Sequence, residues 1–244
     1  MKAWTGLALC LLTNGALAQD IEQVTVYGST MAGFWKIERP KSIEVTFFHG
    51  VKWGPISAWL CRIEQAKAEA TVHCLGGPVL QNGTATLSDG KIHLAWGFMV
   101  ARLVVDGIFE TPKHYTGTFA VKLAGISHEN PAPVGGTKIV PSPQAPDPDG
   151  KAALLRTILT EGLSGVPFDA NAIKKNAGSL ADTLKAVLPG PVLQVTWIGR
   201  EPRYNKGGKE LNAISVYAVE FEGGERICGL HQRGDGTLDA FQCV

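Results

Sequence analysis

The chain has 244 residues, of which 23 are basic and 22 are acidic, so its formal net charge is +1. Because each half is also close to neutral, no net field would attract DNA, RNA or an anionic membrane surface, and we expect no nucleic-acid partner. The length suits two domains of about 100 residues each, and neither would need a metal ion or a partner chain in order to fold.

Residues 1–18 have the pattern of a secretory signal peptide. Lys2 precedes a short apolar run, and Ala16-Leu17-Ala18 supplies the small residues of a cleavage site before Gln19. The apolar run is too short to cross a bilayer as a permanent helix, and no later stretch of about 20 residues is apolar throughout. We therefore predict a bacterial protein that is periplasmic or secreted, with no transmembrane segment in the mature chain.

Residues 19–129 show strand patterns without a convincing helix. Roughly ten short candidate strands follow one another, from QVTVYG at residue 23 to TGTFAVKLAG at residue 116. Turn signals such as Asn82-Gly83 and Asp106-Gly107 separate many of them. Apolar and polar residues alternate around Phe119, Val121 and Leu123, as expected for a strand with one buried face. The pattern predicts an all-β antiparallel barrel or sandwich.

The tripeptide Gly33-Phe34-Trp35 has the form G-x-W near the start of these strands. It resembles the first motif of the lipocalins and other calycins. The resemblance implies a barrel in which Trp35 closes one end under a basic residue, and an internal pocket for a small apolar ligand. The candidate ligand contacts are Trp35, Trp53, Trp59 and Trp96, because ligand pockets are mostly apolar. The alternative is that these rings form the core or cover the barrel ends.

The stretch 130–150, NPAPVGGTKIVPSPQAPDPDG, contains six of the 14 prolines of the chain. Proline fixes φ and has no N–H to donate, so such a run favours extended and solvated backbone. No periodic apolar positions are visible in this stretch. We therefore predict a Pro-rich, semi-rigid linker between two domains, each of which would fold alone.

Residues 151–244 begin with helical spacing. Asp149 is a candidate N-cap, and Gly162 or Gly165 can end the helix. Asp169 offers a second N-cap, and the sequence from Ser179 to Asp182 has the form of a capping box before a further helix. The first helix carries apolar residues at intervals that place them on one side: Leu154, Leu155, Ile158, Leu159 and Leu163.

Four strand patterns follow these helices: VLQVTWIG, AISVYAVEF, ERICGLHQ and TLDAFQCV. The turns Gly223-Gly224 and Asp235-Gly236 join the last three into a meander. Helices packed on one face of a four-stranded antiparallel sheet make an α+β domain. The order of elements resembles small cystatin-like or NTF2-like (nuclear transport factor) modules, and this resemblance assigns no residue roles.

Four cysteines remain after the signal peptide, and they form two pairs. Cys61 and Cys74 lie symmetrically about one predicted turn, and Cys228 and Cys243 lie symmetrically about Asp235-Gly236. Each pair can face its partner across a hairpin, so we predict the disulfides Cys61–Cys74 and Cys228–Cys243. In an ideal hairpin the second pair would occupy a hydrogen-bonded site, with Cα atoms about 5.5 Å apart. Two pairs of buried free thiols are the alternative.

The loop after the first strand of the meander concentrates positive charge. Its cations are candidates to receive an anionic group or an acidic partner surface. An ordinary solvated hairpin tip is the alternative, because Glu201 and Glu210 dilute the charge. The four candidate contacts are Arg200, Arg203, Lys206 and Lys209.

Sequence motifs of common exported enzymes and of cofactor sites are missing. We find no G-x-S-x-G, H-E-x-x-H, Walker or G-x-G-x-x-G pattern, and no C-x-x-C pair, so we predict no cofactor and no metal. The leading hypothesis is an exported binding or interaction protein that holds a small apolar ligand in the barrel. The alternatives are an enzyme of proton-transfer or hydrolytic type with its site in a domain cavity, and a protein-docking module such as an inhibitor of a secreted hydrolase.

Overall fold

The computed structural model describes residues 31–46, 52–66, 69–75, 82–98, 101–123, 126–127, 131–177, 190–204 and 210–244. The predicted signal peptide, the helix predicted after Ser179, and the two cations Lys206 and Lys209 lie outside these ranges. Among the helices within them, none is both long and apolar enough to cross a membrane.

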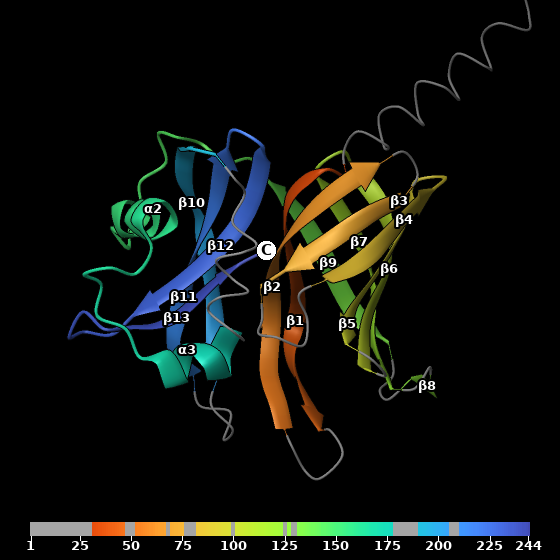
Figure 1. The fold of residues 1–244 in the computed structure, drawn as a ribbon. Coiled ribbons are helices and arrows are strands. Elements are labelled where there is room, and N and C mark those ends of the chain that lie inside the picture. The colour runs from red at the N-terminus through yellow and green to blue at the C-terminus, as the bar shows by residue number, and fades with distance from the viewer. Residues whose placement is uncertain are drawn as a thin grey trace, which may run out of the picture.

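The first sheet has nine strands, and eight of them close into an antiparallel barrel, as predicted. Strands pair in chain order from β1 to β7, β7 also pairs with β9, and β9 pairs with β1, so the sheet returns to its first strand (Figure 1). The short β8 extends the end of β7. The strands are β1 (Gly33–Thr46), β2 (Lys52–Ala66), β3 (Glu69–Cys74), β4 (Asn82–Ser88), β5 (Lys91–Phe98), β6 (Ala101–Thr111), β7 (His114–Leu123), β8 (Ile126–Ser127) and β9 (Ala132–Ile139).

The strand that closes the barrel, β9, lies within the stretch predicted as a linker. It pairs with β1 on one side and with β7 on the other. Gly136 lies so close to Tyr115 that a Cβ at this position would come within 2.0 Å of the ring. The structure differs from the prediction because Pro131 and Pro133 stand at the start of the strand, where proline is tolerated. The connection to the next module therefore begins only after Ile139.

Inward-facing side chains of the barrel form one buried cluster. On each strand they occupy alternate positions, as the two-residue period of a strand requires. The sequence predicts that Phe119 and Val121 lie on the buried face of a strand, and their side chains are 1% and 2% exposed. The other members include Trp35, Ile37, Trp59, Ile63, Val72, Leu94, Trp96, Val105, Phe109 and Tyr115. The barrel therefore has a core of its own.

The second module is a four-stranded antiparallel meander with two short helices in its described part. The strands lie in the order β10-β11-β12-β13, as predicted. Leu155, Ile158 and Ile173 of the helices pack on one face of the sheet, against Tyr217 and Phe241 among others. The elements are α2 (Ala152–Glu161), α3 (Ala170–Ala177), β10 (Val192–Tyr204), β11 (Glu210–Phe221), β12 (Gly224–Gln232) and β13 (Leu238–Cys243).

The predicted caps of the two helices are partly correct. Asp169 caps α3, because its Oδ1 accepts the N–H of Ala172 at 2.9 Å. Gly162 ends α2 with φ of 78°, a conformation that glycine adopts without strain. Asp149 does not cap α2; the N–H of Ala152 donates to Oδ2 of Asp147 instead. The carboxylate of Asp149 cannot cap the helix because it accepts hydrogen bonds from side chains of the sheet.

Both predicted disulfides are present. Cys61–Cys74 joins β2 to β3, Cys228–Cys243 joins β12 to β13, and each pair has a Cα separation of 4.1 Å. The second pair occupies a non-hydrogen-bonded site, because the backbones of Ile227 and Val244 next to it exchange both hydrogen bonds. The hydrogen-bonded site expected for an ideal hairpin is therefore not the site that the structure shows. An irregularity between His231 and Gln232 shifts the register of this hairpin.

The other face of the four-stranded sheet packs against the outside of the barrel. A second apolar cluster joins the two modules, and we call this contact region the junction. Figure 1 shows β1 and β2 facing the sheet, with α2 and α3 on the opposite side. The sheet is therefore covered on both faces. The junction cluster comprises Phe34, Leu60 and Leu75 of the barrel and Ile198, Val216, Ala218 and Ile227 of the sheet.

Candidate functional site

Three of the four tryptophans predicted as ligand contacts lie inside the barrel. Trp35 and Trp59 are 0% exposed, and Trp96 is 1% exposed. Trp53 lies on β2 opposite Val45, and its side chain is outside the described part of the structure. The three buried rings come from strands β1, β2 and β5 and divide into two aromatic layers.

The Trp35 layer is a cluster of three buried rings inside the barrel. The Trp35 ring lies 5.8 Å from the ring of Phe109 and 5.6 Å from that of Tyr115, measured between centroids. Its indole N–H donates to the carbonyl of Met31 at 2.8 Å, so the chain entering β1 covers the layer. Phe109 and Tyr115 therefore fill the space next to Trp35, inside the barrel for which the lipocalin resemblance implied an internal pocket.

The Trp59–Trp96 layer is the second aromatic layer. Trp59 stacks on Phe119 at 5.1 Å and meets Trp96 edge-on at 5.7 Å. The guanidinium carbon of Arg39 lies 4.7 Å from the centre of the Phe119 ring, and Arg39 is only 9% exposed. A cation over an aromatic face is attracted by the ring quadrupole. This layer thus combines apolar rings with a buried positive charge.

Three polar atoms on the aromatic rings of these layers find no hydrogen-bond partner among the residues that the structure describes. The indole nitrogens of Trp59 and Trp96 and the hydroxyl of Tyr115 are buried, and the described residues offer them no hydrogen bond. Burial raises the pKa of Tyr115, so its hydroxyl stays protonated. An unsatisfied buried donor costs about 1 to 3 kcal/mol, and such groups in native proteins usually meet water or a ligand. These atoms are the strongest sign of a binding site in the barrel.

The junction contains a buried carboxyl group, Glu201, which the sequence analysis had placed in the charged loop as a residue that dilutes the positive charge. Glu201 of β10 is 6% exposed, and its Oε2 accepts the N–H of Leu60 on β2 at 3.4 Å. Burial raises the pKa of Glu201 to about 8, although the hydrogen bond from Leu60 opposes this shift. The alternation of side chains along a strand could not predict which face of the sheet Glu201 occupies, because the register of β10 is irregular on both sides of this residue.

A second polar contact crosses the junction at Glu64. Arg62 on the same strand donates to Glu64, and Arg226 of β12 approaches the same carboxylate at 3.5 Å. His73 of β3 lies 3.7 Å away from it. Burial would raise the pKa of Glu64, but the hydrogen bond from Arg62 and the surrounding positive charges hold it below its usual value. Two arginines and a histidine thus converge on one carboxylate.

The segment between the modules is anchored to the sheet through Asp147 and Asp149. Arg200 Nε donates to Asp149 at 2.9 Å, Ser215 Oγ donates at 2.7 Å, and the Trp197 indole donates at 3.3 Å. The hydrogen bond from Arg200 is the main cause that lowers the pKa of Asp149 to about 2. Tyr217, interpreted from the sequence as core, is buried as predicted. Its hydroxyl also donates to Asp147 at 3.2 Å.

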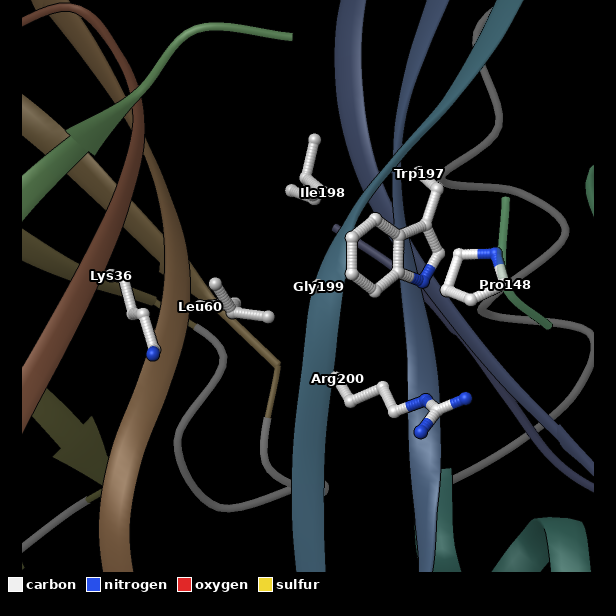
Figure 2. Close-up of a pocket in the computed structure, with 7 residues that line it drawn as sticks. All are labelled: Lys36, Leu60, Pro148, Trp197, Ile198, Gly199 and Arg200. Carbon is white, nitrogen blue, oxygen red and sulfur yellow. The ribbon is translucent and has the colours of Figure 1, made fainter. Parts of the chain in front are cut away.

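Of the four cations predicted to receive an anion, the structure describes the side chain of Arg200 alone. Its partner is Asp149 of the same chain. Arg203 lies on β10, but its side chain is outside the described part of the structure. Lys206 and Lys209 are outside it completely. Arg200 also lines a hollow of about 350 Å³ between the two modules (Figure 2). The hollow is bordered by Lys36, Leu60, Pro148, Trp197, Ile198, Gly199 and Arg200.

A histidine in the second module is oriented by a carboxylate. His231, 6% exposed, is hydrogen-bonded through Nδ1 to Asp239. Arg233 donates to Asp239 at 3.3 Å and to Asp169 at 2.9 Å, so the chain of contacts links the last hairpin to the start of α3. No group of three His, Cys, Asp or Glu side chains in the described ranges could hold a metal ion.

Comparisons of the chain with known protein families, with curated proteins and with solved structures find no match.

Proposed function

We propose that this chain is an exported binding protein that holds a small, largely apolar ligand in its barrel, beside the Trp59–Trp96 layer. The ligand carries an oxygen, from a carbonyl or carboxylate group for example, that accepts hydrogen bonds from the indole N–H groups of Trp59 and Trp96. The observation that carries the proposal is the burial of these two donors without a partner among the described residues.

The chemistry of the layer supports this class of ligand. Aromatic rings offer a large apolar surface, and a few polar groups fix the orientation of a ligand in such a pocket. The nearby guanidinium of Arg39, over Phe119, favours an acceptor with negative charge. Because Phe109 and Tyr115 pack around Trp35, we place the ligand beside Trp59 and Trp96, near Arg39. The resemblance to lipocalins agrees with an internal site in a closed eight-stranded barrel.

The disulfides agree with an exported carrier. Disulfides form and persist in oxidising compartments such as the periplasm and the extracellular space. Both bridges close hairpins, Cys61–Cys74 within the barrel and Cys228–Cys243 within the second module. A protein of this kind would bind its ligand outside the cytoplasm.

Native mass spectrometry of the protein purified from its own host tests the proposal. We expect a bound mass that denaturation releases and that contains at least one carbonyl or carboxyl oxygen. The released compound would then be titrated into stripped protein, with tryptophan fluorescence as the readout. Trp96→Phe should weaken binding about fivefold, because it removes one hydrogen bond worth about 1 kcal/mol and keeps an aromatic ring.

Trp197→Phe provides the matched control, because Trp197 is a partly buried indole outside the barrel. It should leave the affinity of the barrel ligand unchanged. A protein that carries no small molecule, and whose Trp59 and Trp96 N–H signals in NMR spectra report contact with ordered water, would contradict the proposal. It would instead favour the protein-docking alternative predicted from the sequence.

A further inference from the structure

Two strands of the barrel wall carry side chains of the interior and side chains of the junction. Neighbouring residues of a strand point to opposite faces, so each of these strands serves both regions. On β1, Trp35 belongs to the barrel core and Phe34 to the junction cluster. On β2, Trp59 belongs to the core and Leu60 to the junction. The second module therefore packs on the same backbone that positions Trp59 (Figure 1).

One polar contact of the junction reaches this backbone at the residue after Trp59. Oε2 of Glu201 accepts the N–H of Leu60 at 3.4 Å, and this N–H belongs to the peptide unit that joins Trp59 to Leu60. The carbonyl of Leu60 accepts the N–H of Leu75 at 3.3 Å, so the chain at the end of β3 binds the other backbone group of Leu60. A side chain of the second module thus completes the hydrogen bonding of β2 next to the ligand layer.

The burial of Glu201 makes this contact sensitive to protonation. Burial is the largest cause that raises the pKa of Glu201 to about 8, and the hydrogen bond from Leu60 opposes the shift. A neutral carboxyl group fits an apolar junction, whereas a carboxylate there loses its hydration. The docked arrangement of the modules therefore favours the neutral form, and contact with water favours the ionised form.

The charged groups on the elements around Glu201 have partners of their own. They are Lys36 with Glu38, Arg62 with Glu64, Arg200 with Asp149, and His231 with Asp239. The strand β11 places Ile214 opposite Glu201. Among the described side chains, no charge contributes to the pKa shift of Glu201. A carboxylate at this position is therefore uncompensated, and we expect it to move towards water and release the N–H of Leu60.

We propose that the second module regulates the ligand site of the barrel through the protonation of Glu201. The neutral carboxyl group restrains the backbone that carries the Trp59 ring, and the ionised group leaves the junction and loosens the Trp59 donor. The inference rests on the proposed function, since it is the ligand that gives Trp59 its role. Because ligand binding and protonation of Glu201 both favour the docked arrangement, each strengthens the other. Ligand affinity should therefore fall as the pH rises through about 8.

The first test needs no ligand. NMR spectra of the oxidised full chain follow the indole N–H signal of Trp59, identified with Trp59→Phe, between pH 6 and pH 9. We expect this signal to shift with a midpoint near pH 8 in the wild type. The shift should be absent in Glu201→Gln and retained in Glu220→Gln, the matched control, because Glu220 is an exposed carboxylate on β11. The same Trp59 titration in Glu201→Gln, or none in the wild type, would overturn the inference.

The second test measures affinity by isothermal titration calorimetry with 2-naphthoate, an aromatic carboxylate that stays ionised between pH 6 and pH 9. In the wild type we expect binding about fivefold weaker at pH 9 than at pH 6, the lower end of the usual range for coupled sites. In Glu201→Gln the affinity should be the same at both pH values. Melting temperatures at pH 6 show that the variants keep the fold.

The two tests separate this inference from the proposed function. Wild-type protein that binds 2-naphthoate equally well at pH 6 and pH 9 would overturn the regulation and leave the ligand proposal intact. Protein that binds no 2-naphthoate, but whose Trp59 signal shifts only when Glu201 is present, would count against the ligand proposal and support the coupling between Glu201 and Trp59.

Discussion

The barrel interior and the junction are both buried, but they bury different chemistry. The interior is built from apolar and aromatic side chains contributed by neighbouring strands, and its buried guanidinium, that of Arg39, lies over the Phe119 ring. The junction buries the ionisable side chains Glu201 and Arg62, at 6% and 7% exposure, beside its apolar cluster. Apolar burial hardly depends on pH, whereas a buried carboxyl group makes stability depend on its protonation. We therefore expect the attachment of the second module to depend on pH, and the stability of the barrel core to depend on it much less.

The largest effect is expected from cutting the chain on either side of β9. A fragment of residues 19–129 lacks the strand that pairs with both β1 and β7, so the barrel stays open and exposes two unpaired edges. We expect it not to unfold cooperatively. A fragment of residues 19–140 keeps β9 and should show a cooperative melt by circular dichroism. If both fragments melt alike, closure by β9 contributes little and the barrel core alone specifies the fold.

The buried carboxyl group of the junction should make the stability of the protein depend on pH. The pKa of Glu201 is about 8 in the folded protein, against 4.5 for an ordinary glutamate. Between these values the folded protein keeps a proton that the unfolded chain has released. The free energy of unfolding should therefore fall as pH rises from about 4.5 to 8, by at most about 1.4 kcal/mol per pH unit, and then level off.

Glu201→Gln removes this titration and keeps a side chain of similar size. The variant and the wild type should have similar stability near pH 4.5, and the variant should be the more stable protein at pH 8 in urea titrations. Glu220→Gln on the neighbouring strand β11 is the matched control, because Glu220 is exposed. Parallel pH profiles for wild type and Glu201→Gln would show that Glu201 ionises without cost, contrary to its burial in the junction.

A smaller effect is expected at the anchor of the connecting segment. Asp149→Asn weakens the contacts with Arg200, Ser215 and Trp197, and should lower the free energy of unfolding by about 1 kcal/mol, since Arg200 is half exposed. The pKa of Asp149 is about 2, below the ordinary 3.8, so its contribution is present above pH 4 and is lost as pH falls towards 2. Asp235→Asn, in the exposed turn of the last hairpin, serves as the comparison in thermal melts at pH 7. A larger loss for Asp235→Asn would mean that the anchor contributes little.

Much of the barrel core could be predicted from alternation along single strands. Phe119 and Val121 face inward as predicted, and Trp35, Trp59 and Trp96 are buried in the core, as the alternative interpretation held. Their role as ligand contacts stays a prediction. Alternation succeeds here because the side chains of a strand point to opposite faces with a period of two.

The elements that the sequence misplaced are those whose role depends on distant partners. Proline content suggested that residues 130–150 would be solvated throughout, but composition does not reveal that β1 and β7 each leave an edge open for β9. Asp149 has the residue type of a helix cap, yet Arg200, which lies 51 positions away, competes for its carboxylate. Residue type limits what a side chain can bind, whereas the fold selects among the available partners.

The sequence by itself determined the local pairings of this protein. Cys61 with Cys74 and Cys228 with Cys243 are 13 and 15 positions apart, so one hairpin each brings them together and the turn signals predict their register closely enough for a bridge. Tertiary structure alone decided the closure of the barrel by β9 and the burial of Glu201. Leu60 and Glu201, for example, are hydrogen-bonded across 141 positions. Contacts over such separations depend on how whole sheets pack against each other, and a local pattern of residues does not predict that packing.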